Sequence, residues 1–215
     1  MPACVTAAGY DAVAEEYSQR LYRELDNKPF DRTFLDRLAS RIAEGLVLDI
    51  GCGPGHVGKH IAGHGHRVLG ADVSEKMVAI ARRLNPGLRF EQGDMRRLLF
   101  DDKSFAAIVS FYSIIHVAAG ELNVVFAEMR RVLQPGGLLA IAFHVGDQIL
   151  RIDQLWGIKT SLDFVFFQPQ QVACELSSAG LAVLESIERA PYDQSIEAQT
   201  RRCYMLAQRP KELAE

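Results

Sequence analysis

The apolar residues of this sequence follow two different periodicities. In residues 46–145, short runs of consecutive apolar residues alternate with longer segments in which apolar residues recur at every third or fourth position. The short runs are typical of strands buried on both faces, and the longer spacing is typical of amphipathic helices. The expected strands are 46–50, 67–73, 88–94, 104–113 and 138–145, and the expected helices between them are 54–62, 74–84 and 122–133. This alternation favours a parallel sheet that is covered by helices on both faces.

Two helices are predicted before the first strand. Apolar residues at helical spacing cover residues 10–25 and again residues 30–42, and Pro29 interrupts the pattern between them. We therefore expect an N-terminal helical cap. Tyr10 and Tyr17, which recur on the first helix, have two interpretations: core packing, or a lid whose hydroxyl groups close over a ligand.

The C-terminal part of the chain breaks the alternation of strand and helix. Residues 168–179 are expected to be helical, and the strands 181–187 and 202–208 follow with no helix between them. Parallel strands need a crossover connection, so we expect this pair to be antiparallel and to lie at one edge of the sheet. The predicted fold class is α/β: a three-layer sandwich around a seven-stranded, mostly parallel sheet with an antiparallel C-terminal strand pair.

We expect a single domain over residues 1–215. Its parts are a helical cap (1–45), a ligand-binding core (46–145), an insertion (146–167) and a C-terminal helix with the strand pair (168–215). The insertion reads as irregular and carries Trp156 and Phe164, and long connections of this kind are often lids. Its aromatic residues have two interpretations: the wall of a substrate pocket, or a small separate core under the loop.

Composition and charge narrow the classes of partner. The net charge is −3, and no basic run suggests a nucleic-acid surface. No stretch approaches the roughly 18–20 consecutive apolar residues of a membrane span, and the N-terminus lacks the features of a secretory signal. The four cysteines form no C-x-x-C pair, which is typical of reduced thiols in the cytoplasm. We expect a cytoplasmic protein with a small-molecule partner.

The stretch VLDIGCGPGHVG, residues 47–58, is the main chemical signal. A strand that ends in a glycine-rich turn and opens a helix points backbone N–H groups and a positive helix end at one spot, which suits an anionic ligand. About twenty residues later, Asp72 ends the next predicted strand, where an acid can accept hydrogen bonds from a ribose diol. Asp49 is expected to be buried, which is costly without a partner, so it can anchor the amino group of a ligand. Together these residues predict a nucleoside-containing cofactor.

A dinucleotide fingerprint fits this stretch poorly. In the pattern G-x-G-x-x-G counted from Gly51, the third glycine is replaced by His56. An NAD-dependent oxidoreductase therefore remains as the first alternative function. A non-catalytic module that retains the cofactor site is the second.

Four segments in the right order and spacing then identify a family. LDIGCGPG, GADVSEKM, GDMRRLLFDDKSFAAIVS and EMRRVLQPGGLLAIAF, between Leu48 and Phe143, closely resemble the class I S-adenosylmethionine-dependent methyltransferases that act on small molecules. The resemblance implies a Rossmann-like sandwich, S-adenosyl-L-methionine as cofactor and S-adenosyl-L-homocysteine as product. It leaves open whether an O, N, S or C atom is methylated.

The family pattern assigns cofactor-binding positions in this sequence. The first motif cradles the methionine part, Asp72 binds the ribose, and Val73 and Met77 pack on the adenine. Asp94 accepts from the adenine amino group, and the end of the fourth strand lies beneath the methyl group. The implied set is Tyr17, Asp49, Gly51, Cys52, Gly53, Gly55, Asp72, Val73, Met77, Gly93, Asp94, Met95, Ser110 and Phe111.

Methyl transfer needs few catalytic groups, because the cofactor carries the activated methyl and the protein mainly orients the nucleophile. His116 and His144 follow the fourth and fifth strands at the edge where open α/β sheets bind ligands, so they are the candidate bases. A structural role is the alternative for each. Tyr10, Tyr112 and Trp156 are the candidate substrate contacts.

His56, His60 and His64 recur every four residues, so they are expected on one helix face. The spacing resembles that of metal ligands, but no neighbouring Cys or Asp in the sequence completes a site. The prediction is therefore a solvated or packed helix face, and no metal.

Overall fold

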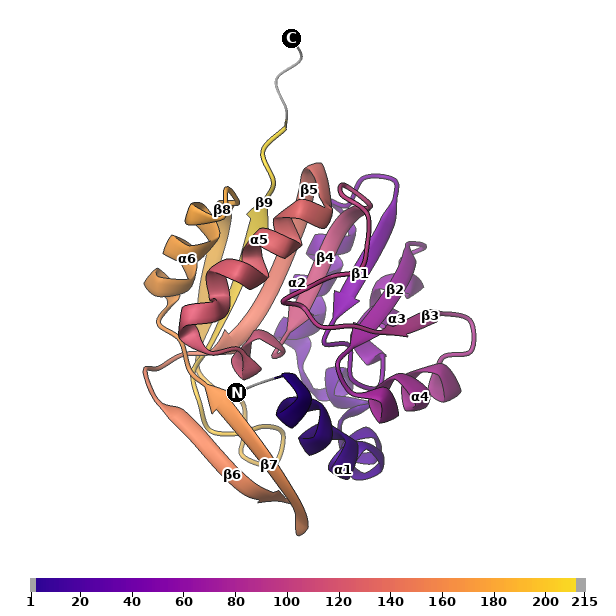
Figure 1. Ribbon diagram of the computed structural model, residues 1–215, viewed down its shortest axis with the longest axis vertical. Helices are drawn as coiled ribbons and strands as arrows, with labels where there is room; N and C mark the ends of the chain where they lie inside the picture. The colour runs from indigo at the N-terminus through magenta and orange to yellow at the C-terminus, as the bar shows by residue number, and fades with distance from the viewer. Residues whose placement is uncertain (1–2, 212–215) are drawn as a thin grey trace.

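The computed structural model describes residues 3–211 and shows the predicted three-layer sandwich (Figure 1). The strands of the main sheet lie in the order β3-β2-β1-β4-β5-β9-β8. They are β1 (Leu46–Ile50), β2 (Arg67–Asp72), β3 (Arg89–Gln92), β4 (Phe105–Phe111), β5 (Leu133–His144), β8 (Ala182–Arg189) and β9 (Arg202–Gln208). Neighbouring strands from β3 to β5 are parallel, and β9 is antiparallel to both β5 and β8, as expected for the C-terminal pair.

Helices cover both faces of this sheet. They are α1 (Ala3–Leu21), α2 (Pro29–Ala39), α3 (His56–Gly63), α4 (Glu75–Leu84), α5 (Leu122–Val132) and α6 (Pro169–Ser178), with 3₁₀ turns η1 (Glu24–Asn27), η2 (Ile114–His116) and η3 (Ala119–Glu121). Successive strand residues point to opposite faces, so Val47 belongs to the core cluster that includes α2 and α3, while Leu48 belongs to the cluster that includes α5 and α6. Both side chains are fully buried, which explains why the strands read as continuous apolar runs.

The ends of several elements differ from the predicted ones for identifiable reasons. Helix α3 begins at His56 instead of residue 54, because Gly55 is its N-cap with a left-handed backbone (φ 83°). Strand β5 begins at Leu133 and takes in the expected turn at 134–137, with an irregular register opposite β4. The N-cap of α4 is Ser74 as predicted, and its hydroxyl accepts a hydrogen bond from the Met77 N–H at 3.1 Å.

The glycine corner, residues 51–55 between β1 and α3, needs its glycines for two reasons. Gly51, Gly53 and Gly55 all have positive φ, a conformation that other residues rarely adopt. A Cβ atom at Gly51 would also lie 2.2 Å from the Ser113 Cβ, and one at Gly55 would lie 2.7 Å from the Phe90 ring. The chain therefore turns sharply here and brings its backbone close to the end of β4.

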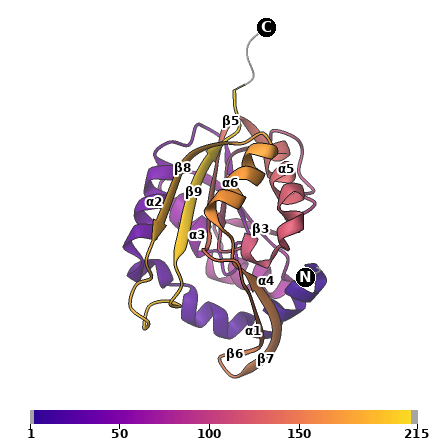
Figure 2. The same cartoon turned by 90° about the vertical axis from the view of Figure 1, so that its left-hand side faces the viewer.

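The insertion at 146–167 is an ordered hairpin, and its prediction as an irregular segment is wrong. Strands β6 (Ile149–Leu155) and β7 (Ile158–Val165) form a separate two-stranded sheet, which projects beside α1 at the carboxyl edge of the main sheet (Figure 2). Trp156 and Gly157 connect them with positive φ at both positions, the signature of a two-residue hairpin turn. The inner face of β7 packs on α1, where the Thr160 hydroxyl donates to the Gly9 carbonyl at 2.7 Å.

Candidate cofactor and acceptor site

A cavity of about 520 Å³ lies at the carboxyl edge of the parallel strands. Its floor is the glycine corner and the ends of β1, β2 and β4, and its walls are α1, the hairpin and the loop before β9. Helix α1 and the hairpin stand at the same end of the molecule (Figure 1). The volume lies within the range of ordinary ligand sites.

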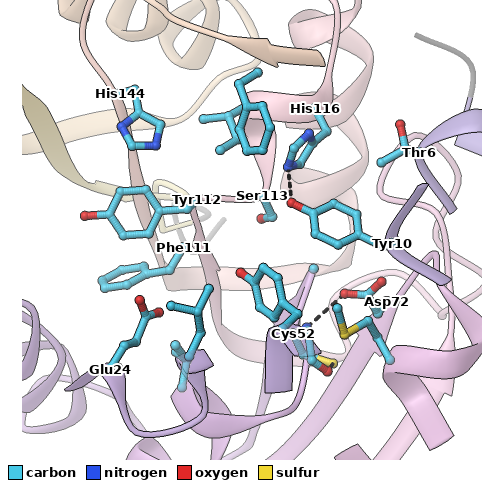
Figure 3. A pocket seen from close by; sticks show the side chains of 18 of the residues that line it. Thr6, Tyr10, Glu24, Cys52, Asp72, Phe111, Tyr112, Ser113, His116 and His144 are labelled. Atoms are coloured by element: carbon cyan, nitrogen blue, oxygen red, sulfur yellow. Dashed lines mark hydrogen bonds between the residues drawn. The ribbon is translucent and has the colours of Figure 1, made fainter. Parts of the chain in front are cut away.

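Asp72 is held rigidly at the end of β2. Its Oδ2 accepts a hydrogen bond from the Gly53 N–H at 2.9 Å, and its Oδ1 accepts one from the Ser74 N–H at 2.8 Å. The first of these bonds joins β2 to the glycine corner (Figure 3). Burial raises the pKa of this carboxyl group, whereas the two amide donors lower it. The carboxylate is thus fixed at the cavity wall with lone pairs left for a ligand.

Asp49 is buried beneath the same corner and has a structural partner. Its Oδ2 accepts a hydrogen bond from the Gly58 N–H at 2.8 Å, which ties β1 to α3. Burial raises the pKa of Asp49 to about 7. The side chain also lines the cavity, so it lies where the predicted contact with a ligand amino group would form.

The structure brings most of the predicted cofactor residues together. Those lining the cavity are Tyr17, Asp49, Gly51, Cys52, Gly53, Asp72, Val73, Met77, Gly93, Asp94, Met95 and Phe111. The carboxylate of Asp94 accepts hydrogen bonds from Arg96, from its backbone N–H at 3.0 Å and from its guanidinium at 3.2 Å.

Two of the predicted cofactor residues, Gly55 and Ser110, do not line the cavity. Gly55 faces Phe90 and Asn85 behind the turn, where it caps α3. Ser110 is fully buried, and its hydroxyl lies 2.6 Å from that of Ser113. Ser113 is the serine that reaches the cavity, because β4 ends at Phe111 and the chain turns before it.

His116 has both ring nitrogens engaged. Nδ1 lies 2.8 Å from the Asp163 carbonyl oxygen, which can only accept, so Nδ1 carries the proton. Nε2 therefore accepts a hydrogen bond from the Tyr10 hydroxyl at 2.6 Å (Figure 3). Burial lowers the pKa of His116 to about 4, which keeps the ring neutral. Its single lone pair is already occupied by Tyr10.

His144 lies on the opposite wall with one nitrogen free. Its Nδ1 is 2.8 Å from the Thr200 hydroxyl, and its ring lies between Tyr112 and Phe166 at centroid distances of 5.4 and 5.2 Å. Nε2 makes no hydrogen bond with any residue of 3–211. Burial, followed by the charges of Arg202 and Lys28, lowers the pKa of His144 to about 3. The ring is neutral, and it lines the cavity.

Tyr112 is held in an unusual backbone conformation by a buried network. Its φ is 51°, which is uncommon for an aromatic residue and typical of functional sites. Its hydroxyl lies 2.6 Å from that of Tyr204, and Tyr204 donates to Asp31 at 2.7 Å. Arg189 in turn donates to Asp31 at 3.1 Å. The network fixes the Tyr112 ring at the cavity wall, and sequence reasoning missed its other three members.

Aromatic contacts between α1 and the hairpin close the cavity on one side. Tyr10 and Tyr17 pack edge to face with centroids 5.6 Å apart, and Tyr17 lies 5.9 Å from Trp156. The Arg20 guanidinium lies 5.3 Å from the Trp156 ring, a cation–π contact. The tyrosines are therefore part of the wall that α1 contributes to the cavity.

The cavity wall also contains a group of charged residues that were not predicted from the sequence. Glu24 accepts hydrogen bonds from His56 at 2.9 Å and from Lys28 at 2.6 Å. Burial raises the pKa of Glu24, but these two donors outweigh it and lower the pKa to about 2. Arg202 pairs with Glu197 at 3.1 Å. Lys28 lies four residues after Glu24, a local spacing that the sequence does contain, whereas His56 lies 32 residues from Glu24, so no local pattern predicts that contact.

The cavity thus lies at the carboxyl edge of a sheet covered on both faces, where the sequence predicts a nucleoside-containing cofactor. Comparisons with known proteins are in line with this prediction. Residues 47–137 match the family described as "Methyltransferase domain". Demethylmenaquinone methyltransferase of Beutenbergia cavernae is 35% identical over 140 residues, which are 63% of this chain and 56% of that protein. Malonyl-[acyl-carrier protein] O-methyltransferase of Enterobacter lignolyticus is 29% identical over 150 residues, 70% of this chain and 57% of that protein.

The fold has close counterparts among solved structures. An S-adenosylmethionine-dependent methyltransferase from Methanosarcina mazei superimposes with a TM-score of 0.72 and 19% identity, covering 82% of this chain and 98% of that chain. Residues 47–137 thus match a methyltransferase domain, and the comparisons support the prediction of a class I S-adenosylmethionine-dependent methyltransferase with S-adenosylmethionine as cofactor. The chain spans little more than half the length of the two curated relatives. Within residues 3–211, no helix is both long and apolar enough to span a membrane.

Proposed function

We propose that this protein transfers the methyl group of S-adenosylmethionine to a small molecule with an apolar or aromatic body. The observation that carries the proposal is one continuous cavity with two different ends. One end holds the glycine corner and Asp72. The other holds the aromatic residues Tyr112 and Phe164. A cofactor at the first end and an acceptor at the second would meet inside a single cavity.

The residues at the first end fit the cofactor. Positive-φ glycines let the backbone approach a ligand closely, and a Cβ at Gly51 would collide with Ser113. Asp72 is fixed to receive a ribose diol, and Asp49 lies beneath the corner to receive an ammonium group. When bound, S-adenosylmethionine supplies an electrophilic methyl group. The protein's part is then to orient the acceptor and to exclude water.

The second end fits an apolar acceptor with one polar, protonated nucleophile. Aromatic and aliphatic side chains of the hairpin form one wall, and Phe111 with Tyr112 forms the facing wall. Flat walls of this kind favour a ring or another apolar surface. The curated relatives named above are methyltransferases for demethylmenaquinone and for malonyl-[acyl-carrier protein], which is compatible with a small or carried acceptor.

Of the two candidate bases, we assign the contact with the nucleophile to His144. Its ring is neutral, and its Nε2 has no protein partner in residues 3–211, so it can accept a hydrogen bond from an O–H or N–H group. The Nε2 lone pair of His116 accepts the hydrogen bond from the Tyr10 hydroxyl. We therefore assign His116 the role of holding α1 in place. Because the low pKa of His144 makes the ring a weak base, its role is to orient the nucleophile by accepting this hydrogen bond.

A turnover screen tests the proposal. The purified protein is incubated with S-adenosylmethionine and a small-molecule extract, and the release of S-adenosylhomocysteine is measured against a sample without extract. Extract-dependent release supports methyl transfer to a small molecule. Binding of S-adenosylhomocysteine without any turnover, across extracts of different polarity, would support the non-catalytic module instead.

A further inference from the structure

The histidines of α3, His56 and His60, and its C-cap residue His64 separate into two groups in the structure. His56 turns toward the cavity and bonds Glu24 at 2.9 Å. His60 and His64 turn the other way and meet Asp36, which belongs to α2. The acid that the sequence around these histidines lacks is therefore supplied by a neighbouring helix.

His60, His64 and Asp36 converge on a small volume at the surface. The Nε2 atoms of His60 and His64 lie 2.7 and 2.9 Å from the same oxygen of Asp36, Oδ1. The three ligand-type atoms lie within 4.8 Å of one another, and the two imidazole centroids are 5.3 Å apart. Side-chain exposures of 21%, 40% and 47% for His60, His64 and Asp36 leave the cluster accessible to an ion from solution.

We propose that His60, His64 and Asp36 form a binding site for a divalent zinc-type cation, which would join α2 to α3. Two imidazole nitrogens and one carboxylate oxygen are a common zinc ligand set, and solvent completes the shell. Tetrahedral bonds of about 2.1 Å place ligand atoms about 3.4 Å apart. The two N···O distances must therefore lengthen by about 0.7 and 0.5 Å, which small side-chain rotations supply.

The protons of the two rings are compatible with this arrangement. Within residues 3–211, neither His60 nor His64 makes a hydrogen bond through Nδ1, so each ring can carry its proton there and offer the Nε2 lone pair to a metal. The ring positions are set by a helical spacing of four residues, which places both histidines on one face. Imidazole ligands favour zinc-type ions over Mg²⁺, which prefers oxygen.

Calorimetric titration with Zn²⁺ tests the site independently of methyl transfer. The protein is untagged, stripped with a chelator, and carries Cys4→Ser and Cys174→Ser to remove its two exposed thiols. We expect one Zn²⁺ per chain, a rise in melting temperature with Zn²⁺, and no saturable binding of Mg²⁺. His60→Ala, His64→Ala and Asp36→Asn should each weaken Zn²⁺ binding at least about tenfold.

A matched control distinguishes Zn²⁺ binding at this site from nonspecific Zn²⁺ binding to other histidines. His66 lies two residues beyond His64 and bonds the Ala39 carbonyl instead, so His66→Gln should leave Zn²⁺ binding unchanged. Circular dichroism of each variant shows that lost binding is not lost folding. The proposal is overturned if the parent protein shows no saturable Zn²⁺ binding, or if any of the three ligand variants, correctly folded, binds Zn²⁺ as tightly as the parent.

Discussion

The Tyr10 hydroxyl donates a 2.6 Å hydrogen bond to Nε2 of His116, and this bond fastens α1 to the carboxyl edge of the sheet. Burial raises the pKa of Tyr10, so the phenol stays protonated and remains the donor. The same contact occupies the lone pair that would make His116 a base. This bond, between residues 106 positions apart, therefore acts together with the Thr160–Gly9 bond to hold α1 beside the cavity.

Tyr10→Phe should lower the free energy of unfolding by about 1–3 kcal/mol, because it leaves a buried imidazole nitrogen without its donor. Chemical denaturation measures this change, and hydrogen exchange should show faster exchange in α1. Tyr17→Phe is the matched control, since the Tyr17 hydroxyl has no hydrogen-bond partner among residues 3–211. Equal effects of the two substitutions would show that the bond does not hold α1.

Asp49→Asn should change how stability depends on pH. The pKa of Asp49 is about 7 in the folded protein and 3.8 when unperturbed, so the folded state binds more protons between these values. The protonated Asp49 therefore makes its full contribution to the free energy of unfolding below about pH 4. This contribution decreases as the pH rises to about 7, by an amount on the order of 4 kcal/mol. The difference in unfolding free energy between Asp49→Asn and the parent, measured over this range without ligand, should grow with pH. A constant difference would contradict the assignment.

Trp156→Asn should loosen the contact between the hairpin and α1. Asn tolerates the positive φ at this turn position, so the hairpin is kept while the contacts with Tyr17 and Arg20 are lost. We expect faster proteolysis within α1 and a higher KM for the acceptor. Trp156→Phe retains an aromatic ring and serves as the control. Unchanged proteolysis in Trp156→Asn would show that this contact does not close the cavity.

His144→Phe should lower kcat at least about tenfold with the acceptor found in the turnover screen, because it removes the nitrogen that orients the nucleophile. The ring between Tyr112 and Phe166 is retained, so the affinity for S-adenosylhomocysteine should change little. An unchanged kcat would show that His144 does not take part in the reaction.

The parts of the fold that were predictable from sequence are those with a strong local pattern. Strands such as β1 and β4 are buried on both faces and read as largely apolar runs, in which Asp49 and Ser110 are the polar exceptions. The hairpin was missed because most residues of β6 are exposed and its turn begins with Trp156 instead of the usual Asn or Asp. Its second turn residue, Gly157, was the available signal.

The site was predictable to the extent that it is local. Motif spacing located the glycine corner and Asp72, which meet because parallel strands end at one edge. From the sequence, Ser110 and not Ser113 was predicted as a cofactor residue, because no sequence pattern reveals the turn at Tyr112. This turn brings Ser113 next to the glycine corner. The pairs Tyr204–Asp31 and His64–Asp36 join separate elements, so their partners emerge only from tertiary structure.

The central claim is that the glycine corner and Asp72 hold an S-adenosyl ligand. Calorimetry with S-adenosylhomocysteine and with NADH, on the parent protein, Asp72→Asn and the exposed neighbour control Glu75→Gln, tests it directly. We predict one S-adenosylhomocysteine per chain for the parent and Glu75→Gln, binding weaker by about 1.5–3 kcal/mol in Asp72→Asn, and no binding of NADH. A folded parent protein that gives no heat with S-adenosylhomocysteine, or that binds NADH instead, would contradict the account.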